Sequence, residues 1–106
     1  MCGIYGAFAP GGLSPEARTW SAKAQSRLRH RGPDGAGSEE RLRGQCLLGH
    51  TRLAIIDLEG GAQPMSDESG GVWVVCNGEI YNYVELRDDL RRKGHLFRTA
   101  CDTEVL

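Results

Sequence analysis

The sequence predicts an α+β domain that combines short strands with two helices. Apolar runs typical of strands occur at residues 4–9, 45–58, 72–76 and 95–99. Longer segments with apolar residues at helical spacing occur at residues 14–28 and 82–93. A chain of 106 residues forms one domain at most, with room for a modest core.

The composition excludes several classes of protein. The 13 Lys and Arg residues balance the 14 Asp and Glu residues, so we expect no basic surface for nucleic acid or for an anionic membrane. No apolar run is long enough to span a bilayer, and the N-terminus lacks the apolar core of a signal peptide. We therefore expect a cytoplasmic protein that binds neither nucleic acid nor membrane.

The four cysteines show no metal-binding pattern. Cys2, Cys46, Cys76 and Cys101 include no C-x-x-C pair and have no histidine at zinc-ligand spacing. Disulfides are not expected in a reducing compartment. Cys46 and Cys76 lie in apolar runs and are interpreted as small core residues. We predict no metal site.

The first strand follows a cysteine at position 2. If Met1 is removed, Cys2 carries a free α-amino group beside its thiol. An α-amino group titrates at about pH 8 and can accept the thiol proton, so nucleophile and base would belong to one residue. The plainer interpretation, that Cys2 is only the residue after the start codon, is also open.

The first helix has a clear beginning and end. Ser14 is a typical N-cap, Pro15 suits the first helical position, and Glu16 places a negative charge in the first turn. The face predicted to pack carries Ala17, Trp20, Ala24 and Leu28. Turn chemistry in the segment 29–35 ends the helix.

The middle of the chain contains an arginine in a segment fit for burial. Residues 37–44 are polar and predict a surface loop or the end of a hairpin, and residues 45–58 predict a strand, or a strand followed by a bend. Burial of Arg52 is costly unless its charge meets an anion. Two partners are open: a structural carboxylate or the carboxylate of a ligand.

A predicted fully buried strand, residues 72–76, leads into Asn77-Gly78. This dipeptide is a strong signal for a hairpin turn. An Asn amide and a Gly backbone N–H at a strand end are also suited to hold a developing negative oxygen, as in an oxyanion hole. The two interpretations are compatible.

The last third predicts a second helix between two short elements. Asn82 and Glu85 fit a capping box, Leu86 and Leu90 are expected to face inward, and Gly94 ends the helix. Residues 95–99 predict a short strand. Residues 102–106 begin another helix, with Asp102 as its expected cap.

Four segments together resemble a known family. They are residues 1–4 (Met-Cys-Gly-Ile), 29–35 (Arg-His-Arg-Gly-Pro-Asp-Gly), 49–57 and 77–82 (Asn-Gly-Glu-Ile-Tyr-Asn). In this order and spacing they resemble the N-terminal glutaminase domain of glutamine-hydrolysing asparagine synthetases, a class II glutamine amidotransferase. The resemblance covers the whole chain. It implies an N-terminal-nucleophile hydrolase fold, an αββα sandwich of antiparallel sheets, with residues 1–106 as a partial, N-terminal portion of the domain.

The resemblance also implies roles in glutamine hydrolysis. Cys2 would attack the side-chain amide of glutamine, with its own α-amino group as base and later as proton donor to ammonia. Asn77, through its side-chain amide, and Gly78, through its backbone N–H, would form the oxyanion hole. The resulting Cys2 thioester would be hydrolysed by water to release glutamate.

Three further residues are implied to bind L-glutamine. Arg52 would bind the α-carboxylate, and Glu79 and Asp102 would receive the α-ammonium group. No cofactor is implied for this step; ATP and Mg²⁺ are implied only for a synthetase domain that would use the ammonia to convert aspartate to asparagine. Two alternatives remain: a non-catalytic truncated module that docks on a synthetase domain, or a glutaminase that serves a different amidation acceptor.

Overall fold

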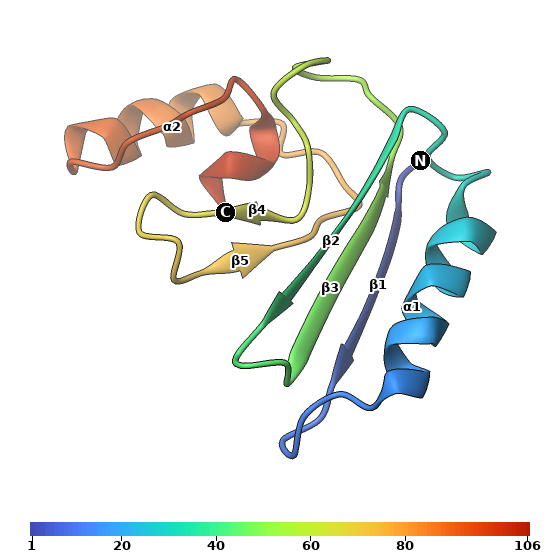
Figure 1. Ribbon diagram of the computed structural model, residues 1–106. Coiled ribbons are helices and arrows are strands. Elements are labelled where there is room, and N and C mark those ends of the chain that lie inside the picture. The colour runs from blue at the N-terminus through green and yellow to red at the C-terminus, as the bar shows by residue number, and fades with distance from the viewer.

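A computed structural model describes residues 1–106 of the chain. A three-stranded sheet with one helix on one side lies beside a two-stranded sheet and a second helix (Figure 1). The elements are β1 (Gly3–Phe8), α1 (Pro15–Leu28), β2 (Gly35–Arg41), β3 (Cys46–Arg52), β4 (Met65–Ser66), β5 (Trp73–Val74), α2 (Tyr83–Arg92) and a 3₁₀-helix, η1 (Asp102–Val105). All strand pairs within the two sheets are antiparallel. The predicted combination of helices with antiparallel sheets is confirmed.

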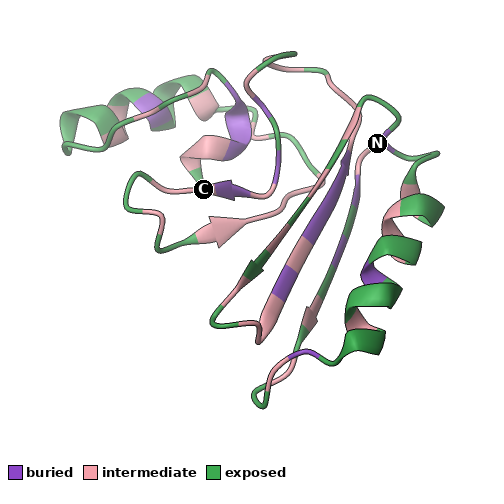
Figure 2. Ribbon diagram, viewed as in Figure 1, coloured by how far each residue is buried: buried purple, intermediate pink, exposed green.

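The central strand β3 organises the larger sheet, whose order is β1-β3-β2. Alternate side chains of β3 point to opposite faces. Leu47 joins a small core with Tyr5 and Leu13, and the Thr51 hydroxyl donates to the Leu28 carbonyl at 3.1 Å. These contacts place α1 over one face. His50 therefore lies on the opposite face; like Thr51 it is essentially inaccessible, and Figure 2 shows the buried positions along β3.

The helix α1 begins as predicted. The Ser14 hydroxyl accepts the Ala17 N–H at 3.3 Å, which satisfies one of the free amide groups of the first turn. The predicted face packs on the sheet through its alanines and Leu28, whereas Trp20 lies at the edge, 47% exposed. The Trp20 ring meets the Tyr5 ring edge-on, with centroids 6.2 Å apart.

Of the two predictions for residues 37–44, the end of a hairpin is confirmed in part and the surface loop is wrong. These residues belong largely to β2, which pairs with β3 along its whole length, and only residues 42–45 make the turn between the two strands. The polar side chains of β2 alternate between half-buried and exposed positions on an edge strand. One of them, Glu40, pairs with Arg18 of α1 at 2.7 Å.

The predicted buried strand at residues 72–76 is much shorter and more exposed. Only Trp73 and Val74 pair with β4, and the Val72 side chain is 66% exposed. The Trp73 ring instead stacks under the Arg41 guanidinium of β2, 4.6 Å from the ring centroid. Asn77-Gly78 is not a hairpin turn, because the chain continues from there into α2.

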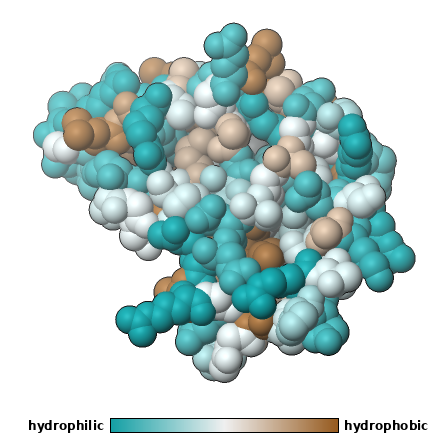
Figure 3. Space-filling model, in the orientation of Figure 1, coloured by the Kyte–Doolittle hydropathy of each residue, from teal (hydrophilic) through white to brown (hydrophobic).

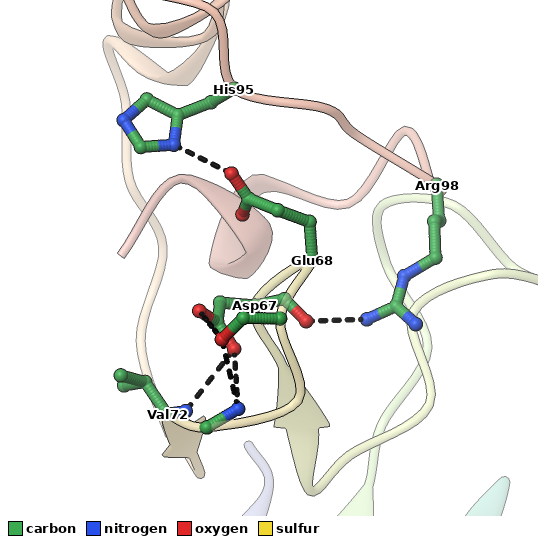
Figure 4. Close-up of polar contacts among 7 residues, drawn as sticks. Asp67, Glu68, Val72, His95 and Arg98 are labelled. Carbon is green, nitrogen blue, oxygen red and sulfur yellow. Dashed lines mark hydrogen bonds and ion pairs between the residues drawn. The ribbon is translucent and has the colours of Figure 1, made fainter.

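The turn between β4 and β5 is held by polar contacts to the segment after α2 (Figure 4). The Asp67 carboxylate accepts the Val72 N–H at 3.1 Å, and the Asp67 carbonyl accepts from Arg98 at 3.1 Å. His95 contacts the Glu68 carboxylate at 2.8 Å. Residues 95–99 are thus an irregular segment tied down by side chains, and the predicted strand is wrong.

The helix α2 has the predicted extent but different contacts. Its N-cap, Asn82, makes no side-chain hydrogen bond, so the predicted capping box is absent. Leu90 is half-buried and Leu86 is exposed, so only part of the predicted inward face is buried. The buried residue is Arg87, whose guanidinium donates to the Cys101 carbonyl at 2.6 Å and lies 5.4 Å from the Phe97 ring centroid.

The final predicted helix is a short 3₁₀ turn. η1 begins at Asp102, and its N-cap is Cys101 instead of Asp102. Asp102 and Thr103 are buried, so this turn is part of the packed interior.

The surface is mainly polar, with apolar side chains scattered between the charged ones (Figure 3). Neither α-helix has the length and apolar composition that crossing a bilayer requires.

We predict that Gly49→Ala destabilises the fold. A Cβ at Gly49 would overlap the Tyr5 ring, which is held by Trp20 and by a 2.8 Å hydrogen bond to Gln25. We expect a loss of about 1–3 kcal/mol in the free energy of unfolding, measured by urea denaturation. Gly11→Ala is the control because nothing lies within 4 Å of its added Cβ. Equal stability of the two variants would contradict this account of the core.

Candidate active site

One cavity, of about 320 Å³, lies beside the start of β1 and the end of β3. It brings together every residue for which the sequence suggests a role in chemistry or binding. The predicted residues that line it are Cys2, Arg52, Asn77, Gly78, Glu79 and Asp102. They come from four separate parts of the chain, and the fold brings these residues together at one cavity.

The Cys2 thiol lies against the end of β3. Its Sγ accepts the Leu53 N–H at 3.3 Å and lies 3.7 Å from the Leu53 carbonyl. These two contacts hold the sulfur at the cavity wall. Met1 also lines the cavity, and 70% of its surface is exposed.

The segment 29–35 packs against the end of β3 and supports the cavity wall that carries Cys2. A Cβ at Gly32 would overlap the Thr51 backbone, so only glycine fits at this position without a shift of the backbone. The Asp34 N–H donates to the Arg52 carbonyl at 2.9 Å, and the Asp34 carboxylate accepts the Ala54 N–H at 2.9 Å. The segment thus fixes the backbone on both sides of Leu53, whose N–H faces Cys2.

The guanidinium of Arg52 is held by backbone carbonyls. It donates to Leu58 at 2.9 Å, to Ile56 at 3.0 Å and also to Asp57. No carboxylate pairs with Arg52, which contradicts the structural-carboxylate alternative. These contacts use three of the five N–H groups of a guanidinium, so donors remain for an anion in the cavity.

The opposite wall is irregular backbone. The side chains of Asn77 and Glu79 make no hydrogen bond within the chain, and Gly78 and Glu79 are exposed. Asp102 is buried, and its carboxylate accepts the Ile80 N–H at 2.8 Å. The donors of Asn77 and the acceptors of Glu79 are therefore available to a ligand.

Two further thiols, those of Cys76 and Cys101, line the cavity. Burial raises the pKa of the Cys76 thiol, and the nearby Asp102 charge raises it further. Burial also raises the pKa of the Cys101 thiol. Both thiols therefore hold their protons at neutral pH, which makes them poor nucleophiles. Cys46 and Cys76 are half-buried, not the full core residues predicted from the sequence.

His50 lies beneath the cavity as a buried imidazole. Neither ring nitrogen has a hydrogen-bond partner. Burial lowers the pKa of His50; the nearby Cys76 carbonyl opposes this, without forming a well-aligned hydrogen bond, and the Arg52 charge lowers the pKa further. His50 is therefore neutral at pH 7.

Asp57 links the loop after β3 to the segment before η1. Its carboxylate accepts the Gly60 N–H at 2.9 Å and the Ala100 N–H at 2.8 Å. These two bonds hold the pKa of the Asp57 carboxyl below its usual range. Asp57 adopts a left-handed φ of 51°, which Asp tolerates better than most residues.

Sequence reasoning missed several contributors to this site. Gln63 and Asp57 accept hydrogen bonds from backbone N–H groups around the cavity, and the Thr103 hydroxyl accepts one from the Gln63 side chain. Asp57 lay within a recognised motif, but its partners are backbone groups that leave no trace in the sequence. For Gln63, the only local signal is a polar residue between Gly61 and Pro64 in a loop. No group of three or more His, Cys, Asp or Glu side chains is arranged to hold a metal ion.

The comparisons with known proteins agree on one family. The chain matches the family described as "Glutamine amidotransferase domain" over residues 1–106. It is 44% identical to an asparagine synthetase [glutamine-hydrolyzing] of Bacillus subtilis and 44% identical to one of Sandersonia aurantiaca. A third such enzyme, of Oryza sativa subsp. japonica, is 43% identical. Each alignment covers 100% of this chain but only 17–19% of the relative, so the chain spans about a fifth of their length.

We predict that the contribution of Asp57 to stability depends on pH. The lowered pKa of its carboxyl means that the ionised form stabilises the fold above about pH 4, the ordinary pKa of Asp, and that this stabilisation is lost as the pH falls through the lower folded-state pKa. Asp57→Asn should therefore be less stable than the parent at pH 7, with the difference shrinking toward pH 3.

Urea unfolding at several pH values tests this prediction. Asp88→Asn, at an exposed position of α2, is the matched control and should show little difference at any pH. A stability difference for Asp57→Asn that stays constant from pH 7 to pH 3 would show that the carboxylate charge is not what holds Gly60 and Ala100.

Proposed function

The chain belongs to the glutamine amidotransferase domain family, and we propose that it hydrolyses the side-chain amide of glutamine with Cys2 as the nucleophile. The observation that carries this proposal is the convergence of Cys2, Asn77, Arg52 and Asp102 on one cavity. A nucleophile, unpaired amide donors and charges of both signs are the groups that such a reaction needs.

The reaction begins once removal of Met1 frees the Cys2 amine. This amine accepts the thiol proton, and Sγ attacks the amide carbon of glutamine to form a tetrahedral adduct. The adduct collapses as the C–N bond breaks and the protonated amine gives its proton to the leaving ammonia. Water, activated by the same amine, then attacks the thioester, which releases glutamate and restores the thiol.

The oxyanion of the adduct is assigned to Asn77 and Gly78. The Asn77 side-chain amide has no partner within the chain, and neither does the Gly78 backbone N–H. Unpaired donors at a cavity wall can bind a developing charge without first breaking an existing bond. This availability supports their role in the transition state.

The two ends of the amino-acid backbone are assigned to opposite charges. Arg52, with donors left after its three backbone contacts, binds the α-carboxylate. Glu79 and Asp102 receive the α-ammonium group from the other wall. Recognition of both ends would select free glutamine over glutamine within a peptide.

For the use of the released ammonia, our proposal rests on the similar proteins. The similar proteins are named asparagine synthetases, and this chain corresponds to about a fifth of their length. We propose that the ammonia serves a synthetase domain that converts aspartate to asparagine with ATP and Mg²⁺. We propose no cofactor for the glutaminase step, since the residues at the cavity offer a nucleophile, hydrogen-bond donors and charges of both signs.

Mass spectrometry of the intact chain tests the nucleophile. After exposure to a diazo-ketone analogue of glutamine, we expect the loss of Met1 and one adduct, which maps to Cys2 and is absent from Cys2→Ala. Cys76 and Cys101 should not react, because burial raises the pKa of both thiols. Retained Met1, or adducts spread over the four cysteines, would instead favour a non-catalytic module that docks on a synthetase domain.

Steady-state kinetics of glutamate release test the oxyanion hole. Asn77→Ala should lower kcat by about 10²–10³-fold with a small change in KM, because the amide acts mainly in the transition state. Its stability should not change, since the side chain makes no hydrogen bond in the chain. Asn82→Ala is the control, as Asn82 also lacks a side-chain bond but lies outside the cavity. An Asn77→Ala variant as active as Asn82→Ala would refute the assignment.

A further inference from the structure

Gln63 is a buried amide that bonds at both ends of its side chain. It is 9% exposed and lines the cavity, although it lies in the loop that precedes β4. Its carbonyl oxygen Oε1 accepts the Cys76 N–H at 2.6 Å, and its Nε2 donates to the Thr103 hydroxyl at 3.2 Å. One side chain therefore connects three segments that are distant in sequence.

Each of these partners is next to a residue of the proposed active site. Cys76 directly precedes Asn77, and Thr103 directly follows Asp102. Figure 1 shows the stretch leading into β4 running beside η1, which brings Gln63 within reach of Thr103. The amide of Gln63 thus lies between the backbone of the oxyanion hole and the turn that carries Asp102.

The segment that Gln63 holds has no other regular support. Residues 75–79 make no backbone–backbone hydrogen bond, as donors or as acceptors. The well-aligned hydrogen bonds that hold this stretch between β5 and α2 are those from the Cys76 N–H to Gln63 and from the Ile80 N–H to Asp102. Loss of either contact would leave the position of Asn77 poorly defined.

Gln63 is itself anchored on the larger sheet. A Cβ at Gly37 of β2 would overlap the backbone carbonyl of Gln63, so the loop that carries Gln63 lies directly on the face of the sheet. A Cβ at Gly61 would likewise overlap the Arg52 guanidinium. The loop that carries Gln63 therefore lies between the three-stranded sheet and the irregular segment at Asn77, and it fixes the position of that segment relative to the sheet.

We propose that Gln63 is a positioning residue that couples the oxyanion-hole segment to the turn carrying Asp102, and so sets the two walls of the cavity relative to each other. The inference rests on the proposed function for the roles of Asn77 and Asp102. A neutral amide suits the task, because it offers an acceptor oxygen and a donor NH₂ group and adds no charge near the developing oxyanion.

A double-mutant cycle tests the coupling. Gln63→Met keeps the side-chain volume and removes both bonds, and Thr103→Val removes one partner. We expect Gln63→Met to lower kcat by about tenfold or more and Thr103→Val to lower it less. The double variant should be no worse than Gln63→Met alone. Thr103→Ser, which keeps the hydroxyl, is the matched control and should stay within about twofold of the parent.

Hydrogen exchange gives a readout that does not depend on activity. Exchange of the Cys76 amide should accelerate by about tenfold or more in Gln63→Met, less in Thr103→Val, and not in Thr103→Ser. Amides of β3, such as that of Leu48, report global unfolding and should keep their rates. A structural role alone would instead change β3 and Cys76 exchange together and lower activity with the folded fraction.

The outcomes separate the two proposals. Independent effects on kcat that multiply in the double variant, or unchanged Cys76 exchange in Gln63→Met, would overturn the positioning role. Absence of glutamate release by the parent, after Met1 is removed, would overturn the glutaminase proposal. In that case the Cys76 exchange rates alone decide whether Gln63 couples the two walls.

Discussion

The antiparallel pairing of β1 with β3 is the constraint on which the candidate site depends. It sets Gly3 opposite Thr51, and since side chains alternate along a strand, Cys2 and Arg52 both point away from α1. A slip of one residue in this pairing would place the two side chains on opposite faces of the sheet and dismantle the cavity. The ring of Tyr5, which fits only over Gly49, fixes the register from the other face.

The two walls of the cavity are built in different ways. The wall of Cys2 and Arg52 belongs to a three-stranded sheet, where each strand is supported by a ladder of hydrogen bonds. The wall of Asn77 and Glu79 is held by single side-chain contacts to backbone amides. Local opening should therefore begin at the second wall, while the sheet stays intact.

The sequence predicted those features that have a local cause. Helix α1 begins at a Ser-Pro cap, and the apolar runs of β1 and β3 are strands, as their composition indicates. Strand β2 was predicted only as a surface loop or the end of a hairpin, because polar alternation on an edge strand resembles a loop and only the pairing with β3 distinguishes the two. Strand β5 was overestimated because its apolar residues find only a two-residue partner.

The candidate site also combines features with a local cause, which the sequence shows, and features that depend on tertiary contacts, which it does not. The motifs identified the residues that meet at the cavity, since side-chain chemistry is visible in a sequence. They did not reveal that Arg52 is held by carbonyls or that Gln63 holds Cys76. Backbone partners have no sequence signature, because every residue carries the same amide, so these contacts follow only from the three-dimensional path of the chain.

The three backbone carbonyls that bind the Arg52 guanidinium order its side chain before any anion binds. An arginine side chain gives up about 2 kcal/mol of rotamer entropy when it is ordered. Three backbone contacts already restrict the Arg52 side chain within the fold. That entropy is lost when the chain folds, so the α-carboxylate that we propose for Arg52 would meet a side chain that is already ordered, and its affinity would not include the cost of that ordering.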